Sequence, residues 1–186
     1  MTNIDCSEWE EWQKEYRHGA FFVFPPDGIF EKINSLRELY DPKSQSVCGA
    51  HISLTVPLSR ELLERDYDEI QNTLSEVDRF EVQFGPTYNY PGIPGVVLRV
   101  EPSSLFKNLV IRLEEASVFQ NAISRKHPFS PHMTIAEFVT MDRTKEILDE
   151  LKGQDLSGTF ECSQVFYAAP DCDFVFRRGP SFSLKR

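Results

Sequence analysis

Long apolar segments are missing from this sequence, and so are the usual marks of an exported protein. None of the 186 residues belongs to an apolar run near the ~20 residues that a membrane-spanning helix needs. The first segment, Met1–Glu15, is acidic and carries Trp9 and Trp12, whereas a secretory signal needs a basic start and an apolar centre. We therefore expect no contact with a membrane and a cytoplasmic location.

Cysteine is scarce, and its spacing matches no common metal or disulfide framework. The cysteines form no C-x-x-C pair, which favours free thiols in a reducing compartment over disulfides or a zinc site. No H-x-x-x-H motif or carboxylate cluster has metal-ligand spacing, and no G-x-S-x-G motif marks a serine hydrolase. Both hydrolase types are therefore weaker alternatives, and we expect neither a metal nor a cofactor. The four cysteines are Cys6, Cys48, Cys162 and Cys172.

Positive charge is also in short supply. The chain has 20 lysine and arginine residues against 29 aspartate and glutamate residues, which gives a net charge of −9. Proteins that bind long nucleic acids usually carry a basic face, because neutralising phosphates supplies most of their affinity. No basic stripe is visible here. The sequence therefore disfavours a long duplex as a partner and favours a nucleotide or a nucleic-acid end.

Hydrophobic periodicity predicts an α+β protein whose two halves repeat the order strand, helix, strand, helix and strand. Predicted strands cover residues 21–24, 50–58, 80–84, 96–100, 132–139, 160–168 and 174–184. Predicted helices follow Asp27, Ser59 and Ser103 and include residues 147–151. The halves join near a loop at residues 85–95, which is rich in proline and glycine. We expect one domain over residues 1–186, with two pseudo-symmetric β-sheet lobes, helices packed on the outside and a central cleft.

Two short segments match each other, one in each half. Residues 51–54 read HISL and residues 132–135 read HMTI, so both have the order histidine, apolar residue, hydroxyl residue, apolar residue. Strand side chains alternate between the two faces of a sheet, so each histidine shares a face with the hydroxyl two places on. The apolar face must be the buried one. His51 with Ser53, and His132 with Thr134, are therefore expected to face a cleft between the lobes.

These four side chains suit the opening of a cyclic phosphodiester by water. That reaction needs a base to take the proton of the water and an acid to protonate the departing oxygen, and histidine can do either near neutral pH. His51 and His132 are therefore the predicted catalytic pair, although their sequence does not say which is the base. The hydroxyls of Ser53 and Thr134 can donate hydrogen bonds to the phosphate oxygens. The arrangement requires no metal.

The doubled motif resembles that of the 2H phosphoesterase superfamily, which includes 2′-5′ RNA ligase and RNA 2′,3′-cyclic phosphodiesterase proteins. The resemblance covers most of the chain and includes the approach to the second motif, where residues 128–135 read PFSPHMTI. It implies a bilobal α+β fold with a cleft between the lobes. It also implies hydrolysis of 2′,3′-cyclic phosphates to 2′-phosphates, or reversible 2′-5′ bond chemistry. The expected ligand is a nucleotide or RNA terminus with a cyclic phosphate, and the expected state is a monomer.

The sequence departs from that family at three positions. Ser53 stands where threonine is commoner, His127 where many members have arginine, and Glu137 where some have a basic residue. The last two changes reduce the positive charge available to a polyanionic RNA. A protein that binds a nucleotide or phosphate on the same fold without turnover is therefore the alternative hypothesis.

Three further residues are candidates for contact with a substrate. His127 could touch a phosphate, and Phe129 and Tyr88 could stack on a base. The competing interpretation is that His127 is an exposed loop residue and that the two aromatic rings pack the central loop against the lobes. By the same reasoning Thr55 is read as a polar strand position.

Overall fold

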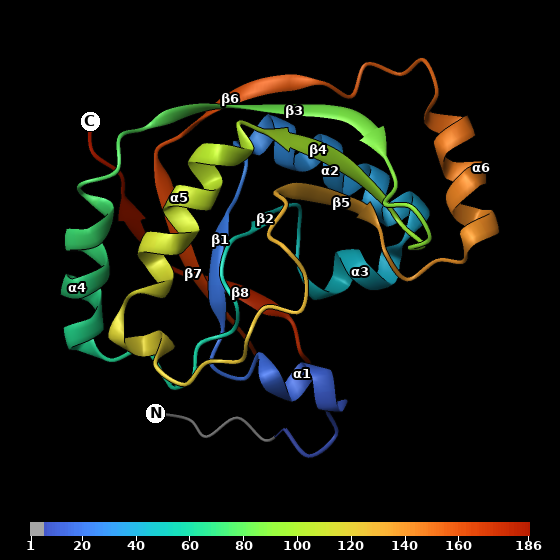
Figure 1. Cartoon of the computed structure of the whole chain (residues 1–186). Coiled ribbons are helices and arrows are strands. Elements are labelled where there is room, and N and C mark those ends of the chain that lie inside the picture. The colour runs from blue at the N-terminus through green and yellow to red at the C-terminus, as the bar shows by residue number, and fades with distance from the viewer. Residues whose placement is uncertain (1–5) are drawn as a thin grey trace.

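Two four-stranded antiparallel sheets flanked by helices make up the computed structural model, which describes residues 6–186 (Figure 1). The strand order is β2-β1-β7-β8 in the first sheet and β5-β4-β3-β6 in the second. This confirms the predicted α+β architecture. The helices are α1 (Glu11–Glu15), α2 (Asp27–Tyr40), α3 (Pro42–Val47), α4 (Glu64–Leu74), α5 (Ser103–Glu114), the 3₁₀ turn η1 (Ser117–Phe119) and α6 (Met141–Leu151). The strands are β1 (Ala20–Val23), β2 (Ile52–Ser53), β3 (Phe80–Tyr88), β4 (Val96–Glu101), β5 (His132–Ala136), β6 (Gly158–Cys162), β7 (Gln164–Pro170) and β8 (Phe176–Ser183).

The two sheets divide the chain differently from its two sequence halves. The first sheet takes β1 and β2 from early in the chain and β7 and β8 from late in it, while the second takes the four strands between them. The predicted single strand at residues 160–168 is wrong, because β6 and β7 belong to different sheets and only Ser163 separates them. The loop that follows Tyr88 connects β3 to its neighbour β4 within the second sheet.

The strand predicted at residues 50–58 is much shorter in the structure, where β2 covers Ile52–Ser53 alone. Beyond it the chain still runs beside β1, since the Leu54 amide donates to the Phe21 carbonyl at 2.9 Å. The Phe21 amide, however, donates to the hydroxyl Oγ1 of Thr55 at 3.1 Å. A side chain thus takes the place of a backbone partner, and the regular ladder ends there.

The alternation of side chains between faces is as the sequence predicted. Ile52 and Leu54 are fully buried, and so are Met133 and Ile135 on the other motif strand. All four belong to one apolar core that both sheets share. The polar members of each motif are thereby turned to the opposite face.

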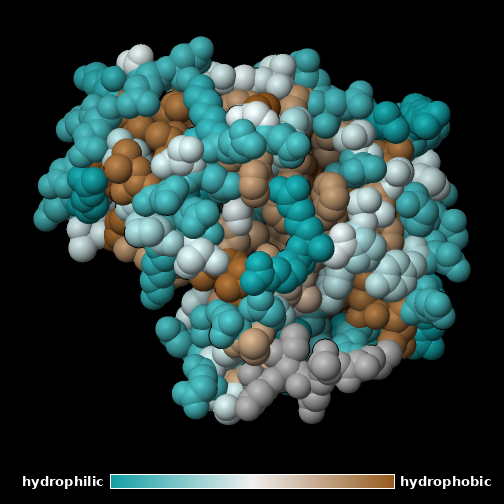
Figure 2. All heavy atoms as spheres, turned by 180° about the vertical axis from the view of Figure 1, so that it is seen from behind, coloured by the Kyte–Doolittle hydropathy of each residue, from teal (hydrophilic) through white to brown (hydrophobic). Residues whose placement is uncertain are grey.

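The surface carries apolar side chains in separate places. Figure 2 shows, from behind, a mostly hydrophilic face with apolar areas divided by polar side chains. No helix within residues 6–186 is long and apolar enough to cross a membrane. The large apolar side chains that are exposed are Trp12, Leu39, Ile93, Leu105, Ile111, Ile123 and Phe138.

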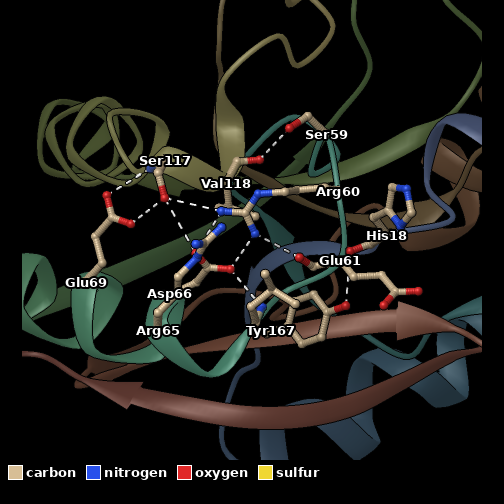
Figure 3. Close-up of polar contacts among 11 residues, drawn as sticks. His18, Ser59, Arg60, Glu61, Arg65, Asp66, Glu69, Ser117, Val118 and Tyr167 are labelled. Carbon is tan, nitrogen blue, oxygen red and sulfur yellow. Dashed lines mark hydrogen bonds and ion pairs between the residues drawn. The ribbon is translucent and has the colours of Figure 1, made fainter. Parts of the chain in front are cut away.

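A buried ion pair fixes the start of α4. Asp66, which is fully buried, accepts from both terminal nitrogens of Arg60, at 2.5 and 2.8 Å, and from the Leu63 amide at 2.7 Å (Figure 3). The hydrogen bonds from Arg60 lower the pKa of Asp66 to about 2, against the opposing effect of burial. Because this carboxylate caps the helix from inside, the predicted cap at Ser59 is wrong. The Ser59 hydroxyl instead donates to the Val118 carbonyl at 2.8 Å.

Asp66→Asn is expected to lower the free energy of unfolding by about 2 kcal/mol at neutral pH, the value of a pKa shift of this size. The folded-state pKa lies below that of the unfolded chain, so the contribution is present above pH 4 and is lost as the pH falls through 2. Urea unfolding of both proteins at pH 7 and at pH 2.5 measures the difference. Asp68→Asn, which removes an exposed carboxylate from the same helix, is the control. An equal loss at both pH values would contradict the assignment.

Candidate functional site

The two motif strands lie side by side where the sheets meet. Strand β2 is the edge of the first sheet and β5 is the edge of the second, and the two edges are in contact (Figure 1). His51 directly precedes β2, and His132 is the first residue of β5. The structure therefore brings together the two histidines that the sequence singled out, from segments far apart in the chain.

Each imidazole is held in the same way. Nδ1 of His51 lies 2.7 Å from the carbonyl oxygen of Gly49, and Nδ1 of His132 lies 2.8 Å from that of Ser130. A carbonyl oxygen can only accept, so Nδ1 must carry the proton in both rings. Nε2 is consequently the nitrogen of each ring that can exchange a proton with a ligand. The matching carbonyl, two residues before each histidine, is a second sign of pseudo-symmetry.

The hydroxyl residues lie beside their histidines. Oγ of Ser53 is 3.1 Å from Nε2 of His51, and the Ser53 side chain is exposed. Thr134 is half-buried and lines the same hollow as His132. Both hydroxyls thus lie on the polar face of the two edge strands, and the Ser53 hydroxyl donates to Nε2 of His51, which carries no proton. Thr55, by contrast, is buried and occupied by the Phe21 amide, so it is a structural residue.

His51 lies in an environment that disfavours its charged form. Burial lowers its pKa to about 4, and the positive charges of Arg37 and His132 add to that effect, while the Gly49 carbonyl opposes it. His51 is therefore a neutral imidazole at pH 7, with a lone pair on Nε2.

Arg37 is the residue that sequence analysis missed. Its side chain from α2 is 1% exposed, and its guanidinium donates to the Thr134 carbonyl at 2.6 Å and to the Cys48 carbonyl at 2.9 Å. It also donates to the Ser44 carbonyl at 3.0 Å and to the Ser44 hydroxyl at 2.8 Å. Arg37 therefore ties β5 to the segment that leads into β2. The sequence did carry a signal that Arg37 is buried. It lies four residues after the apolar Ile33, and that spacing puts both side chains on one face of the helix.

Two hollows open on the paired edge strands. One, of about 590 Å³, contains Ser53 and His132 and is bordered by the loop at residues 123–130. The other, of about 350 Å³, contains His51 and Ser53 and is bordered by α1 and the turn between β7 and β8. Ser53 and Tyr16 line both, so the two hollows are neighbours. His51 lines the smaller one and His132 the larger one.

Two of the three further candidates for substrate contact line a hollow beside the histidines, and the third does not. His127, which is exposed, and Phe129 both line the larger hollow. Tyr88 lines none of the hollows around the histidines, but its ring packs edge to face on Tyr90, with centroids 5.0 Å apart. The Tyr90 hydroxyl lies 3.4 Å from Nδ1 of His132, so Tyr90 rather than Tyr88 contacts this histidine. Tyr88 thus lies behind Tyr90, and its contact with a substrate stays a prediction.

No metal centre is apparent in the described part of the chain. Residues 6–186 contain no group of three or more histidine, cysteine, aspartate or glutamate side chains placed to hold an ion. Cys48 and Cys162 are buried, and burial raises the pKa of each thiol to about 12.

The fold and the paired histidine strands define the two-histidine class of phosphoesterases. The family model described as the 2′-5′ RNA ligase superfamily matches residues 25–169, and the chain belongs to that superfamily. Its sequence is 27% identical over 150 residues to an Oceanobacillus iheyensis protein named "Putative phosphoesterase", which covers 78% of this chain and 86% of the relative. A Bacillus cytotoxicus protein of the same name is 26% identical over 136 residues, covering 72% and 77%. Membership of the superfamily supports phosphoesterase activity.

Solved structures share the fold at low sequence identity. LigT of Escherichia coli, in a crystal structure with 3′-AMP, superposes with a TM-score of 0.62 at 15% identity and covers 91% of this chain and 99% of that one. A Thermus thermophilus structure has a TM-score of 0.53 at 14% identity, covering 89% and 97%. These solved structures therefore confirm the α+β architecture of this chain.

Arg37→Lys is expected to lower the free energy of unfolding by about 3 kcal/mol. Lysine keeps the charge but lacks the planar fork that reaches several carbonyls at once, so buried acceptors lose their donors. Chemical denaturation measures the loss. Arg112→Lys, on an exposed ion pair with Glu76 at 3.2 Å, is the matched control and should change stability by less than about 0.5 kcal/mol. Equal effects of the two substitutions would show that Arg37 does not tie the strands.

The imidazole of His51 is expected to titrate near pH 4, because its burial and two positive neighbours disfavour protonation. Carbon-detected or proton-detected NMR of the ring Cε1–H follows this midpoint, and loss of the signal in His51→Gln assigns it. A midpoint at or above 6.5 would contradict the described environment of the ring.

Proposed function

We propose that this protein hydrolyses the 2′,3′-cyclic phosphate of a nucleotide or an RNA end, with His51 and His132 as the catalytic pair. The observation that carries the proposal is the meeting of two edge strands, each presenting an imidazole whose Nδ1 is held by a backbone carbonyl. Two Nε2 atoms on opposite sides of one phosphate can remove one proton and supply another.

In this proposal His51 is the base and His132 the acid. The neutral ring of His51 takes a proton from water through Nε2 as the water oxygen bonds to phosphorus. His132 in its protonated form gives the Nε2 proton to the ribose oxygen as its bond to phosphorus breaks. Breaking the bond to O3′ yields a 2′-phosphate. Afterwards His51 holds the extra proton, and exchange with solvent restores both rings.

The hydroxyls stabilise the charge that develops on the phosphate. Ser53 and Thr134 would each donate a hydrogen bond to a non-bridging oxygen, and such donors act most strongly in the transition state. The Ser53 hydroxyl has one proton, which it donates to Nε2 of His51 at 3.1 Å, so in this proposal it turns from that nitrogen to the phosphate when the substrate binds. Crystal structures of Escherichia coli LigT with 3′-AMP and with phosphate support a nucleotide as the ligand here. RNA processing in the cytoplasm is the setting we propose.

Purified protein in EDTA is expected to convert nucleoside 2′,3′-cyclic phosphates to 2′-phosphates. His51→Ala and His132→Ala should each lower kcat by about 10²–10⁴-fold, the usual contribution of one acid or base. Chromatography against 2′- and 3′-phosphate standards identifies the product.

The control is His18→Ala, which removes a histidine that lines none of the hollows around the pair. The His18 carbonyl that accepts from the Tyr167 hydroxyl at 3.0 Å is part of the backbone and is kept. This variant should retain full activity. Hydrolysis that survives substitution of both His51 and His132 would overturn the assignment of these residues.

A second candidate function is nucleotide binding without turnover. The Glu137 carboxylate lines the hollow that holds His132 and Thr134, and its negative charge would weaken the stabilisation of a phosphorane there. A nucleotide that raises the melting temperature of the protein, yet is recovered unchanged after long incubation, would favour this alternative.

A further inference from the structure

We propose that the hollow beside His51 is a base pocket, in which the nucleobase of the substrate stacks and presents an amino group to Glu137. This inference rests on the proposed function and specifies its substrate. The base pocket has a volume of about 350 Å³, which lies in the range of small-molecule sites. Its aromatic lining residues are Trp12, Tyr16, Phe22, Phe138, Phe174 and Phe176.

A continuous series of aromatic contacts leads from the rim of this pocket to the catalytic ring. Trp12 packs edge to face on Phe174 with centroids 5.3 Å apart, and Phe174 packs on Phe176 at 5.5 Å. Phe176 packs on Phe22 at 5.6 Å, and Phe22 packs on His51 at 5.0 Å. A base held against these rings would bring its ribose and phosphate toward His51.

The turn that carries Phe174 is built to hold this ring in place. Phe174 has a φ of 59°, in the left-handed region that bulky residues rarely adopt. Asp171 maintains the turn, because its side chain accepts from the amides of Asp173 at 3.1 Å and Val175 at 3.0 Å, and its carbonyl accepts from the Phe174 amide at 3.0 Å. Backbone strain that surrounding contacts enforce is typical of ligand sites.

The charges in the base pocket favour a neutral ring over a second phosphate. Arg37 is its only cationic lining residue among the described residues, and the terminal nitrogens of its guanidinium already donate to Thr134, Ser44 and Cys48. Glu137 is acidic and would repel an anion. Its carboxylate accepts from the Ser44 hydroxyl at 2.5 Å and has further lone pairs to accept an N–H.

The aromatic wall formed by Trp12, Phe174 and Phe176 lies outside the part of the chain that the family model matches. The matched segment, residues 25–169, contains both histidines, whereas α1 and the turn at residues 171–175 fall on either side of it. The two outer segments are joined directly, since the indole of Trp9 donates to the Cys172 carbonyl at 2.9 Å. Stacking of the base therefore rests on segments outside the matched residues, whereas Glu137, the acceptor for its amino group, lies within them.

Hydrolysis of three substrates tests the inference: cytidine 2′,3′-cyclic phosphate, uridine 2′,3′-cyclic phosphate and glycerol 1,2-cyclic phosphate, which has no base. The ratio of kcat/KM for the cytidine to the glycerol compound should fall about tenfold in Trp12→Ala and be restored in Trp12→Phe.

Cytosine should be preferred about fivefold to uracil, and Glu137→Gln should remove that preference, because an amide both donates and accepts. Ile111→Ala, an exposed apolar change on α5, should keep both ratios.

A binding measurement separates this inference from the proposed function. The chain has two tryptophans, so Trp9→Phe leaves Trp12 as the sole tryptophan reporter in the wall. Cytidine should quench the fluorescence of that variant, and ribose should not. If Trp9→Phe does not fold, the loss of quenching between the natural chain and Trp12→Phe gives the same information.

The outcomes are distinct. Quenching by cytidine without hydrolysis of any substrate would refute the proposed catalysis and keep the base pocket. Hydrolysis with substrate ratios that neither Trp12→Ala nor Glu137→Gln changes, and with no quenching, would overturn the base pocket and keep the catalysis.

Discussion

The buried guanidinium of Arg37 is the contact on which the arrangement of the two sheets depends. Strands β2 and β5 are edges, and an edge strand presents carbonyls that lack a ladder partner. Arg37 donates to the carbonyl of Thr134 on one edge and to that of Cys48 just before the other. It therefore satisfies buried acceptors and fixes the spacing between the motifs. The same positive charge helps to keep the His51 ring neutral.

Much of the fold and the central pair of the site follow from local patterns in the sequence. Alternation of apolar and polar residues placed Ile52 and Met133 in the core, and the structure buries both completely. Since side-chain direction in a strand has a period of two, the same patterns turned His51 and His132 to the shared polar face. These conclusions needed no knowledge of which strands pair.

What sequence reasoning could not supply depends on contacts between distant residues. Nothing in residues 160–168 marks the change of sheet at Ser163, because buried apolar positions continue on both sides of it. The early end of β2 depends on a hydroxyl of Thr55 meeting an amide on another strand. The base pocket is likewise hidden, since Trp9 and Cys172 approach only in the folded chain.

The division of the first sheet has a consequence for synthesis on the ribosome. Phe22 of β1 pairs with Phe166 of β7, so β1, the only strand within residues 6–186 with which the first-motif strand β2 pairs, waits for a partner made much later. The second sheet, β3 to β6, is contiguous and can assemble while the nascent chain is still growing. His132 would thus be in place before His51, and the cleft would close only once the last strands have emerged.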